Sequence, residues 1–265
     1  MNELLMSPSR YLRTSELAKA ANIHPNTVRL YEQWGLIQPT ERNPFNNYRR
    51  FTQKHLDQIL LVRQVLRFTL LGGTIRTTVY DIIAQGKQDN LGGALELAYK
   101  LLSQIQAERA QAEAAVRYLE RWAQGVPPDT TTRPLRIGEV ARLLDVSIDQ
   151  LHNWERNNLL ETPRDPSNGY RLYGPDEIGR VRVIRMLIRS RYSMMSILRM
   201  LNKLDRGETE TDQLRQALDT PDDEEDARYV TDHWLTTLSE LETAAHESIG
   251  LIEVTLTRRQ SEEAS

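Results

Sequence analysis

The feature that most constrains this fold is an internal repeat. The segment that begins at Arg13 reads RTSELAKAANIHPNTVRLYEQWGLI, and it aligns at an offset of 123 with the segment from Arg136, RIGEVARLLDVSIDQLHNWERNNLL. Farther along, NNYRRFTQKHL aligns with NGYRLYGPDEI at an offset of 122, so a loop between the two blocks absorbs one residue. Two copies of one sequence pattern predict two copies of one folded unit.

Each copy is followed by a long helical pattern with its apolar residues on one seam. Alternating steps of four and three residues are typical of coiled coils, so each helix is expected to pair with another helix. The first seam consists of Leu91, Leu95, Ala98, Leu102, Ile105, Ala112, Val116, Leu119 and Ala123. The second consists of Trp234, Leu238, Leu241, Ala245 and Ile252, with Leu235, Ala244 and Ile249 beside it.

Two short helices joined by a tight turn are predicted at the start of the first copy. Thr14 or Ser15 can cap the first helix, Pro25 suits the first position of the second, and Gly35 suits a left-handed C-terminal cap. This is the pattern of a helix-turn-helix, whose second helix can enter the major groove of DNA.

The second copy keeps this pattern with different residues. Ser147 and Gln150 form a capping box, and Asn158 stands where Gly35 stood. A hairpin follows in both copies, with a two-residue turn predicted at Asn168-Gly169 and a weaker equivalent at Asn46-Asn47. A basic hairpin beside a helix-turn-helix is a wing, which can hold phosphates on either side of the groove.

These strings resemble the winged helix-turn-helix of the MerR transcriptional regulators of bacteria. The resemblance lies in TVRLYEQWGLI and NNYRRFT, and again in QLHNWERNNLL and NGYRLYGPDEI, and it covers residues 11–124 and 135–260. In that family the unit is followed by two further helices and a long coiled-coil helix for dimerisation. The chain is therefore expected to be mostly α and to contain this plan twice.

The expected organisation has six segments. They are a winged helix-turn-helix domain at 11–89, a coiled-coil helix at 90–124, a linker at 125–134, a second winged helix-turn-helix domain at 135–206, an acidic connector at 207–224, and a second coiled-coil helix at 225–262. The linker, GVPPDTTTRP, is too rich in Pro, Thr and Gly to continue a helix. The acidic run from Asp222 to Asp226 suits the first turn of the last helix.

The resemblance also implies which residues bind DNA, because the second helix reads bases in that family while wing residues hold the backbone. In the first copy it places Asn26, Thr27 and Arg29 in the groove, and Arg29 can pair with guanine through two hydrogen bonds. Tyr31 is placed either at a phosphate or in the core, because its counterpart Trp154 has no hydroxyl. The expected backbone contacts are Arg42, Tyr48, Arg49 and Arg50.

The second copy departs from the family pattern. His152 replaces Arg29, and the acidic residues Asp149 and Glu155 flank it. The expected DNA contacts there are Gln150, His152, Asn153, Arg164, Tyr170, Arg171 and Tyr173. The second unit is therefore expected to hold the backbone with a different base preference. The alternative is that it has become a packing or protein-interaction module.

The formal net charge of −3 is an average over unlike regions. Residues 1–89 carry +5 (12 Lys and Arg, 7 Asp and Glu) and residues 90–133 carry 0 (5 and 5). Residues 134–206 carry +4 (13 and 9), and residues 207–265 carry −12 (4 and 16). The two repeats are the basic regions, and local charge, rather than the average, decides whether a surface attracts nucleic acid.

Other classes of function find little support. Cysteine is absent, which excludes disulfides, thiolate metal sites and cysteine nucleophiles. The histidines lack metal-ligand spacing, and neither a phosphate-binding loop nor an acid–base constellation is present, so the chain is expected to be no enzyme and to carry no metal or cofactor. Without a long apolar run it is expected to avoid membranes and to reside in the cytoplasm with the nucleoid.

The duplication leads to a hypothesis about assembly. Members of the family are homodimers with antiparallel coils, so the two halves of one chain can form a covalent pseudo-dimer that reads an asymmetric operator. The competing assembly is a homodimer through like coils. The expected function is sequence-specific regulation of transcription, with distortion of promoter DNA and RNA polymerase as a further partner. The alternative is a DNA-architectural or recombination-accessory protein, and no effector is identified.

Overall fold

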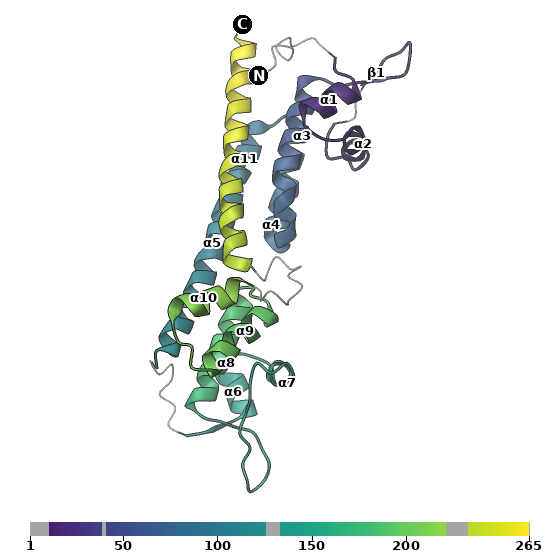
Figure 1. The fold of residues 1–265 in the computed structure, drawn as a ribbon. Helices are drawn as coiled ribbons and strands as arrows, with labels where there is room; N and C mark the ends of the chain where they lie inside the picture. The colour runs from purple at the N-terminus through teal and green to yellow at the C-terminus, as the bar shows by residue number, and fades with distance from the viewer. Residues whose placement is uncertain (1–10, 39–40, 126–132, 221–232, 265) are drawn as a thin grey trace. The chain divides into compact units, whose positions relative to one another are not determined.

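The computed structural model describes residues 11–38, 41–125, 133–220 and 233–264, and it is mostly helical, as predicted (Figure 1). The chain divides into two compact units. Unit 1 comprises residues 1–106 and 240–265, and unit 2 comprises residues 107–239. Both long helices cross a boundary between units, so each unit contains part of each coil. The sequence predicts instead that each coil is a separate segment.

Unit 1 contains the first helix-turn-helix and its wing. Its elements are α1 (Thr14–Ala20), α2 (Pro25–Gln33), β1 (Glu41–Arg42), β2 (Arg49–Arg50), α3 (Gln53–Val65), the 3-10 helix η2 (Leu66–Leu71), α4 (Gly73–Lys87), the first part of α5 (Leu91–Ala123) and most of α11 (Trp234–Glu263). The strands pair antiparallel, with Arg42 opposite Arg49, and a bridge joins Leu12 to Phe51 at the base of the wing.

Unit 2 contains the second helix-turn-helix and its wing. Its elements are β3 (Leu135–Arg136), α6 (Ile137–Leu143), α7 (Ile148–Arg156), β4 (Leu172–Tyr173), α8 (Pro175–Arg189), α9 (Met194–Asp205) and α10 (Thr211–Asp219), with the second part of α5 and the start of α11. β3 pairs with β4, and a bridge between Arg164 and Arg171 closes the wing. The two small hairpin wings predicted from the sequence are therefore present.

The expected caps of α2 and α7 are confirmed. Gly35 and Asn158 follow α2 and α7 with φ of +68° and +58°, in the left-handed region that these two residue types tolerate best. The side chain of Ser147 accepts from the Gln150 amide at 3.0 Å, and the side chain of Gln150 accepts from the Ser147 amide at 2.8 Å. The expected cap of α1 is wrong, because Arg13 occupies that position and its amide donates to Glu16 at 2.7 Å.

The wing turns are longer than predicted. In unit 2 the Asp165 amide donates to the Tyr170 carbonyl at 2.8 Å, and the Gly169 amide donates to the Asp165 carbonyl at 2.8 Å, so residues 166–169 form a four-residue loop. The carboxylate of Asp165 stabilises this wider loop by accepting from the Ser167 amide at 2.9 Å. A two-residue turn at Asn168-Gly169 would lose these bonds.

The coil seams are largely buried within the chain. In unit 1, Tyr99 of α5 donates to Glu253 of α11 at 3.0 Å and Gln106 donates to Glu242 at 3.0 Å, so the two helices run antiparallel (Figure 1). The predicted seam residues are buried except Leu95, Ala123 and Leu235, which are half-buried. Further buried residues on α5 make its stripe wider than a heptad seam; they are Ala94, Leu101 and Ala115.

The segment expected to be an acidic connector contains helix α10. Its last residue, Asp219, accepts from the amides of Leu235 at 2.8 Å and Thr236 at 3.2 Å, which caps the start of α11. The acidic run from Asp222 to Asp226, expected to begin this helix, lies outside the described residues. α11 is described from Trp234, and a carboxylate distant in sequence supplies its cap.

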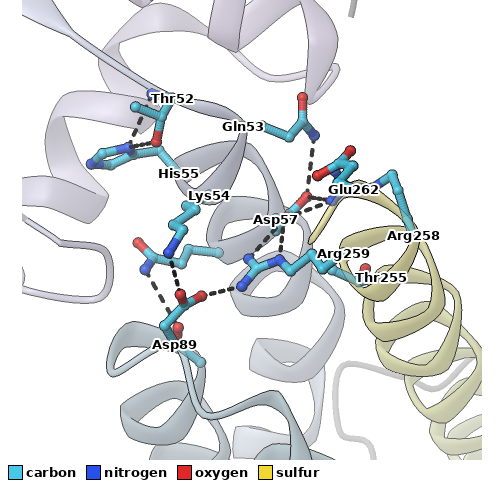
Figure 2. A network of polar contacts seen from close by, with 12 residues as sticks. Thr52, Gln53, Lys54, His55, Asp57, Asp89, Thr255, Arg258, Arg259 and Glu262 are labelled. Atoms are coloured by element: carbon cyan, nitrogen blue, oxygen red, sulfur yellow. Dashed lines mark hydrogen bonds and ion pairs between the residues drawn. The ribbon is translucent and has the colours of Figure 1, made fainter. Parts of the chain in front are cut away.

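The other end of α11 is fixed to unit 1 by ion pairs, which we call the C-terminal ion-pair cluster: Lys54, Asp57, Asp89, Arg258 and Arg259. Arg258 and Arg259 each approach the carboxylate of Asp57 at 2.8 Å. Figure 2 shows the guanidinium of Arg259 between the carboxylates of Asp57 and Asp89, and Lys54 also contacts Asp89. The cluster joins α11 to α3 and to the residues that follow α4.

Among the described residues, no helix combines the length and the apolar character needed to cross a bilayer.

Candidate nucleic-acid interface

The first candidate surface is a hollow of about 550 Å³ between the start of α1, the start of α2 and the wing, which we call the wing hollow of unit 1. The residues described as lining it include no Asp or Glu, and four of them are arginines: Arg13, Arg29, Arg42 and Arg49. A concave surface lined by cations next to an exposed helix end attracts a polyanion such as a DNA backbone.

Arg29 lies on the exposed face of α2. Its guanidinium donates to the Asn26 side chain at 3.0 Å, and both side chains are exposed. Thr27, which lies between them in the sequence, is half-buried. Val28 is fully buried, and its burial fixes which face of the helix points outward. The structure therefore brings together the three residues expected in the groove. Asn26 also orients Arg29 before any ligand is present.

The wing of unit 1 presents an aromatic and two arginines. Tyr48 is 68% exposed, and Arg42 is exposed while donating to the Asn47 carbonyl at 3.3 Å. Arg50 stacks over the Tyr11 ring, with its guanidinium carbon 4.9 Å from the ring centre. Such a stack leaves the edge of the guanidinium available for phosphate oxygens while holding its plane.

The last expected wing contact, Arg49, has a partner within the protein. Its Nε atom donates to Glu32 of α2 at 2.6 Å, and the two side chains are 29% and 17% exposed. Unit 2 repeats this pair, since Arg171 Nε donates to both carboxylate oxygens of Glu155 on α7, at 3.0 and 2.8 Å. The hydrogen bonds from Arg171 hold the pKa of Glu155 below its ordinary value, although burial acts in the opposite direction.

The Glu–Arg pairs attach the wing arginines to the helix that precedes each wing. Each pair joins the wing to the reading helix, so the two parts of the surface keep one relative position. Charge-assisted bonds of this kind are short and directional. The repeat alignment places Glu32 opposite Glu155 and Arg49 opposite Arg171, so the signal was present in the sequence, but nothing in a sequence says that residues 17 or 16 apart touch.

Unit 2 has an equivalent hollow of about 650 Å³ at the start of α6, the start of α7 and the wing. Its cations are Arg136, Arg142, Arg164 and Arg171, and Glu139 also lines it. Tyr170 is 62% exposed, and the guanidinium carbon of Arg136 lies 5.5 Å from its ring centre. Arg13 and Arg136, the first residues of the two repeats, line the hollows but are not among the DNA contacts expected from the sequence.

The reading helix of unit 2 is less suited to DNA than that of unit 1. Gln150 is exposed, but its carbonyl oxygen is used in the cap of α7. Asn153 is half-buried and accepts from the Asn157 side chain at 3.1 Å. His152 is half-buried, and the exposed Asp149 lies one turn earlier on the same helix. The face that carries Arg29 in unit 1 thus carries a histidine and a carboxylate in unit 2.

The structure does not support Tyr173 as a DNA contact. Its side chain is 1% exposed, it packs in the core of unit 2, and burial raises the pKa of its hydroxyl. Its counterpart Phe51, which has no hydroxyl, is also fully buried. Trp154 is 3% exposed, as expected for a packing residue, whereas its counterpart Tyr31 is half-buried with part of its surface in solvent.

No group of three or more His, Cys, Asp and Glu side chains that could hold a metal ion occurs within the described ranges.

Comparison with known proteins identifies both repeats. The model of the family described as MerR HTH family regulatory protein matches residues 12–71 and again residues 135–204. Curated relatives include the HTH-type transcriptional regulator CueR of Salmonella typhi, 40% identical over 53 residues, which are 20% of this chain and 38% of that protein. The CueR of Vibrio cholerae serotype O1 is 38% identical over 56 residues, 21% of this chain and 40% of that protein.

The aligned part of this chain thus spans about two fifths of the length of these relatives. No solved structure matches the chain significantly.

Proposed function

Because the chain belongs to the MerR family of helix-turn-helix regulatory proteins, with two tandem helix-turn-helix units, we propose that it is a transcriptional regulator that binds double-stranded DNA. The observation that carries this proposal is the pair of arginine-lined hollows, each formed by a reading helix and a wing. In unit 1, Asn26, Thr27 and Arg29 read base edges in the major groove. Arg42, Tyr48 and Arg50 hold the backbone on either side.

Unit 2 contributes mainly backbone contacts. Arg164 and Tyr170 are exposed on its wing, and Arg136 extends the same cationic surface. Gln150, His152 and Asn153 provide a base preference that differs from that of α2, because none of them can form the paired hydrogen bonds of an arginine with guanine. Arg49 and Arg171 act indirectly, by fixing each wing to its reading helix.

We further propose that one chain is a covalent pseudo-dimer. Three intrachain observations support this: the antiparallel contacts of α5 with α11 in unit 1, the C-terminal ion-pair cluster, and the contacts of the second part of α5 in unit 2. In unit 2, α5 forms ion pairs from Glu108 to Arg191 at 3.1 Å and from Glu120 to Arg215 at 2.6 Å. Each coil therefore finds an apolar and charged partner in its own chain, and a second chain is not required to cover it.

An operator for such a protein is asymmetric, with two unlike half-sites. Binding of both units to one promoter spacer distorts the DNA so that RNA polymerase can engage it, which is the way of acting implied by the family resemblance. Bending a site of 20–30 base pairs costs on the order of 1–6 kcal/mol, and contacts from two units can offset this.

Selection of bound fragments from random duplex DNA, followed by footprinting, tests this proposal. We expect one continuous footprint over two different half-sites, with the guanine-dependent half protected by unit 1. Arg29→Ala should relax base preference in that half alone. A palindromic consensus would contradict the pseudo-dimer, and the absence of any selected sequence would contradict sequence-specific binding.

A further inference from the structure

The wing loop of unit 1, residues 43–48, presents an aromatic side chain that no role described so far uses. Phe45 is 94% exposed. The loop is held by its own hydrogen bonds: the Asn43 amide donates to the Tyr48 carbonyl at 2.8 Å, and the Phe45 amide donates to the Asn43 side chain at 2.9 Å. It projects away from α1, α2 and α3 (Figure 1). The backbone that carries Phe45 is therefore held by these bonds before any partner binds.

The corresponding loop of unit 2 has the opposite character. At an offset of 122, Phe45 corresponds to Ser167 and Asn43 corresponds to Asp165. The Ser167 hydroxyl donates to Asp165 at 2.7 Å, so both polar groups are engaged within the loop. The loop of the first wing thus carries an exposed phenyl ring, whereas the loop of the second carries a hydroxyl at that position and begins with a carboxylate.

We propose that Phe45 packs against deoxyribose rings in the minor groove beside the half-site bound by unit 1. This inference rests on the proposed DNA-binding function. When α2 occupies the major groove, the wing beside it crosses a phosphate strand, and the groove beyond that strand is the minor groove. Apolar side chains of DNA-binding proteins frequently enter the minor groove and contact its sugars and base steps.

The charge around Phe45 favours DNA over an apolar protein partner. Arg42 precedes the loop, Arg49 and Arg50 follow it, and Glu41 is the only acidic residue among positions 41–50, all of which are described. An exposed phenyl ring between cations matches a ligand that has apolar sugar faces between phosphates. Unit 2 lacks the phenyl ring, so this contact is expected on one flank of the operator only.

Binding of a selected operator, followed by fluorescence anisotropy at several salt concentrations, tests the inference. Phe45→Ser copies the residue of unit 2 and should weaken binding by about 5- to 30-fold, because the apolar contact is lost. The slope of affinity against salt should stay unchanged, since no phosphate contact is removed. Phe45→Leu should restore most of the affinity. Tyr80→Ser, at a 50% exposed aromatic on α4, is the matched control and should bind like the wild type.

Hydroxyl-radical footprinting gives a second readout, because the radical attacks deoxyribose in the minor groove. Phe45→Ser should remove protection on one flank, and an operator shortened to exclude that flank should make the variant and the wild type bind equally. Unchanged affinity and footprint would overturn the inference while leaving DNA binding intact. Unchanged DNA affinity with lost recruitment of RNA polymerase would overturn it in favour of a protein partner. If the wild type bound no duplex, both this inference and the proposed function would fail.

Discussion

Replacement of Asp57 by Asn tests whether charge holds the C-terminal helix on the first DNA-binding unit. The Asp57 side chain is 7% exposed and accepts from Arg258 and Arg259, at 2.8 Å in each case. Asn has nearly the same shape, but it loses the negative charge and turns an NH₂ group toward two guanidinium groups. The substitution therefore removes the attraction without opening a cavity.

The expected loss follows from the burial of the three partners. Removal of one member of a buried ion pair costs about 3–5 kcal/mol, because the other charge stays buried without compensation. The Arg259 side chain is 16% exposed and keeps Asp89 as a partner, while Arg258 is 30% exposed and can turn toward water. We therefore expect a loss of about 2–4 kcal/mol in the free energy of unfolding.

Urea denaturation followed by circular dichroism measures this loss. Asp81→Asn, at an exposed aspartate on α4, is the control and should change the free energy of unfolding by less than about 0.5 kcal/mol. The midpoint should not depend on protein concentration, since the pairs lie within one chain. If Asp57→Asn cost no more than the control, or if its effect depended on concentration, the ion pairs would not be what fastens α11 within its own chain.

Three further predictions concern the DNA surface and the ion-pair cluster. Arg29→Ala should lower discrimination between the operator and single-base variants by about 1–3 kcal/mol, and unchanged discrimination would show that α2 is not the reading helix. Arg171→Ala should weaken binding to all sequences without changing the salt slope, because its guanidinium is paired with Glu155, whereas Arg164→Ala should reduce that slope by about 1. Anisotropy titrations at four salt concentrations would separate the two arginines. Burial opposes ionisation of Asp89, but bonds from Lys54 and Arg259 outweigh it and lower the pKa of Asp89. Its stabilising effect is thus complete above the ordinary value of 3.8 and is lost as pH falls through the lower folded value, so Asp89→Asn should destabilise the protein at pH 7 and converge with the wild type in acid.

Local sequence signals predicted the helix-turn-helix units and the coils well. Gly35, Asn158 and the Ser147–Gln150 cap act within a few residues, where backbone preference decides the structure. The wing turns were predicted less well, because side-chain bonds of Asp165 stabilise a longer loop than the Asn168-Gly169 pair indicates. Local preference was outweighed there by a few added hydrogen bonds.

Contacts between distant residues were beyond the reach of pattern reasoning. In the sequence Glu155 is only an acidic residue that flanks His152, yet in the structure it is the partner of Arg171. The family resemblance implies a DNA contact for Tyr173, yet the alternation of the strand turns its side chain into the core. The C-terminal ion-pair cluster joins residues about 200 positions apart, as Asp57 and Arg259 show, and no local signal marks such a pair.

The mass of the protein bound to a single operator tests the central claim most directly. Native mass spectrometry or light scattering on the complex should give one chain of 30.6 kDa per duplex, and the free protein should have the same mass over a wide range of concentration. One chain would then occupy two unlike half-sites. A complex that holds two chains per operator, with a free protein of twice the chain mass, would contradict the covalent pseudo-dimer.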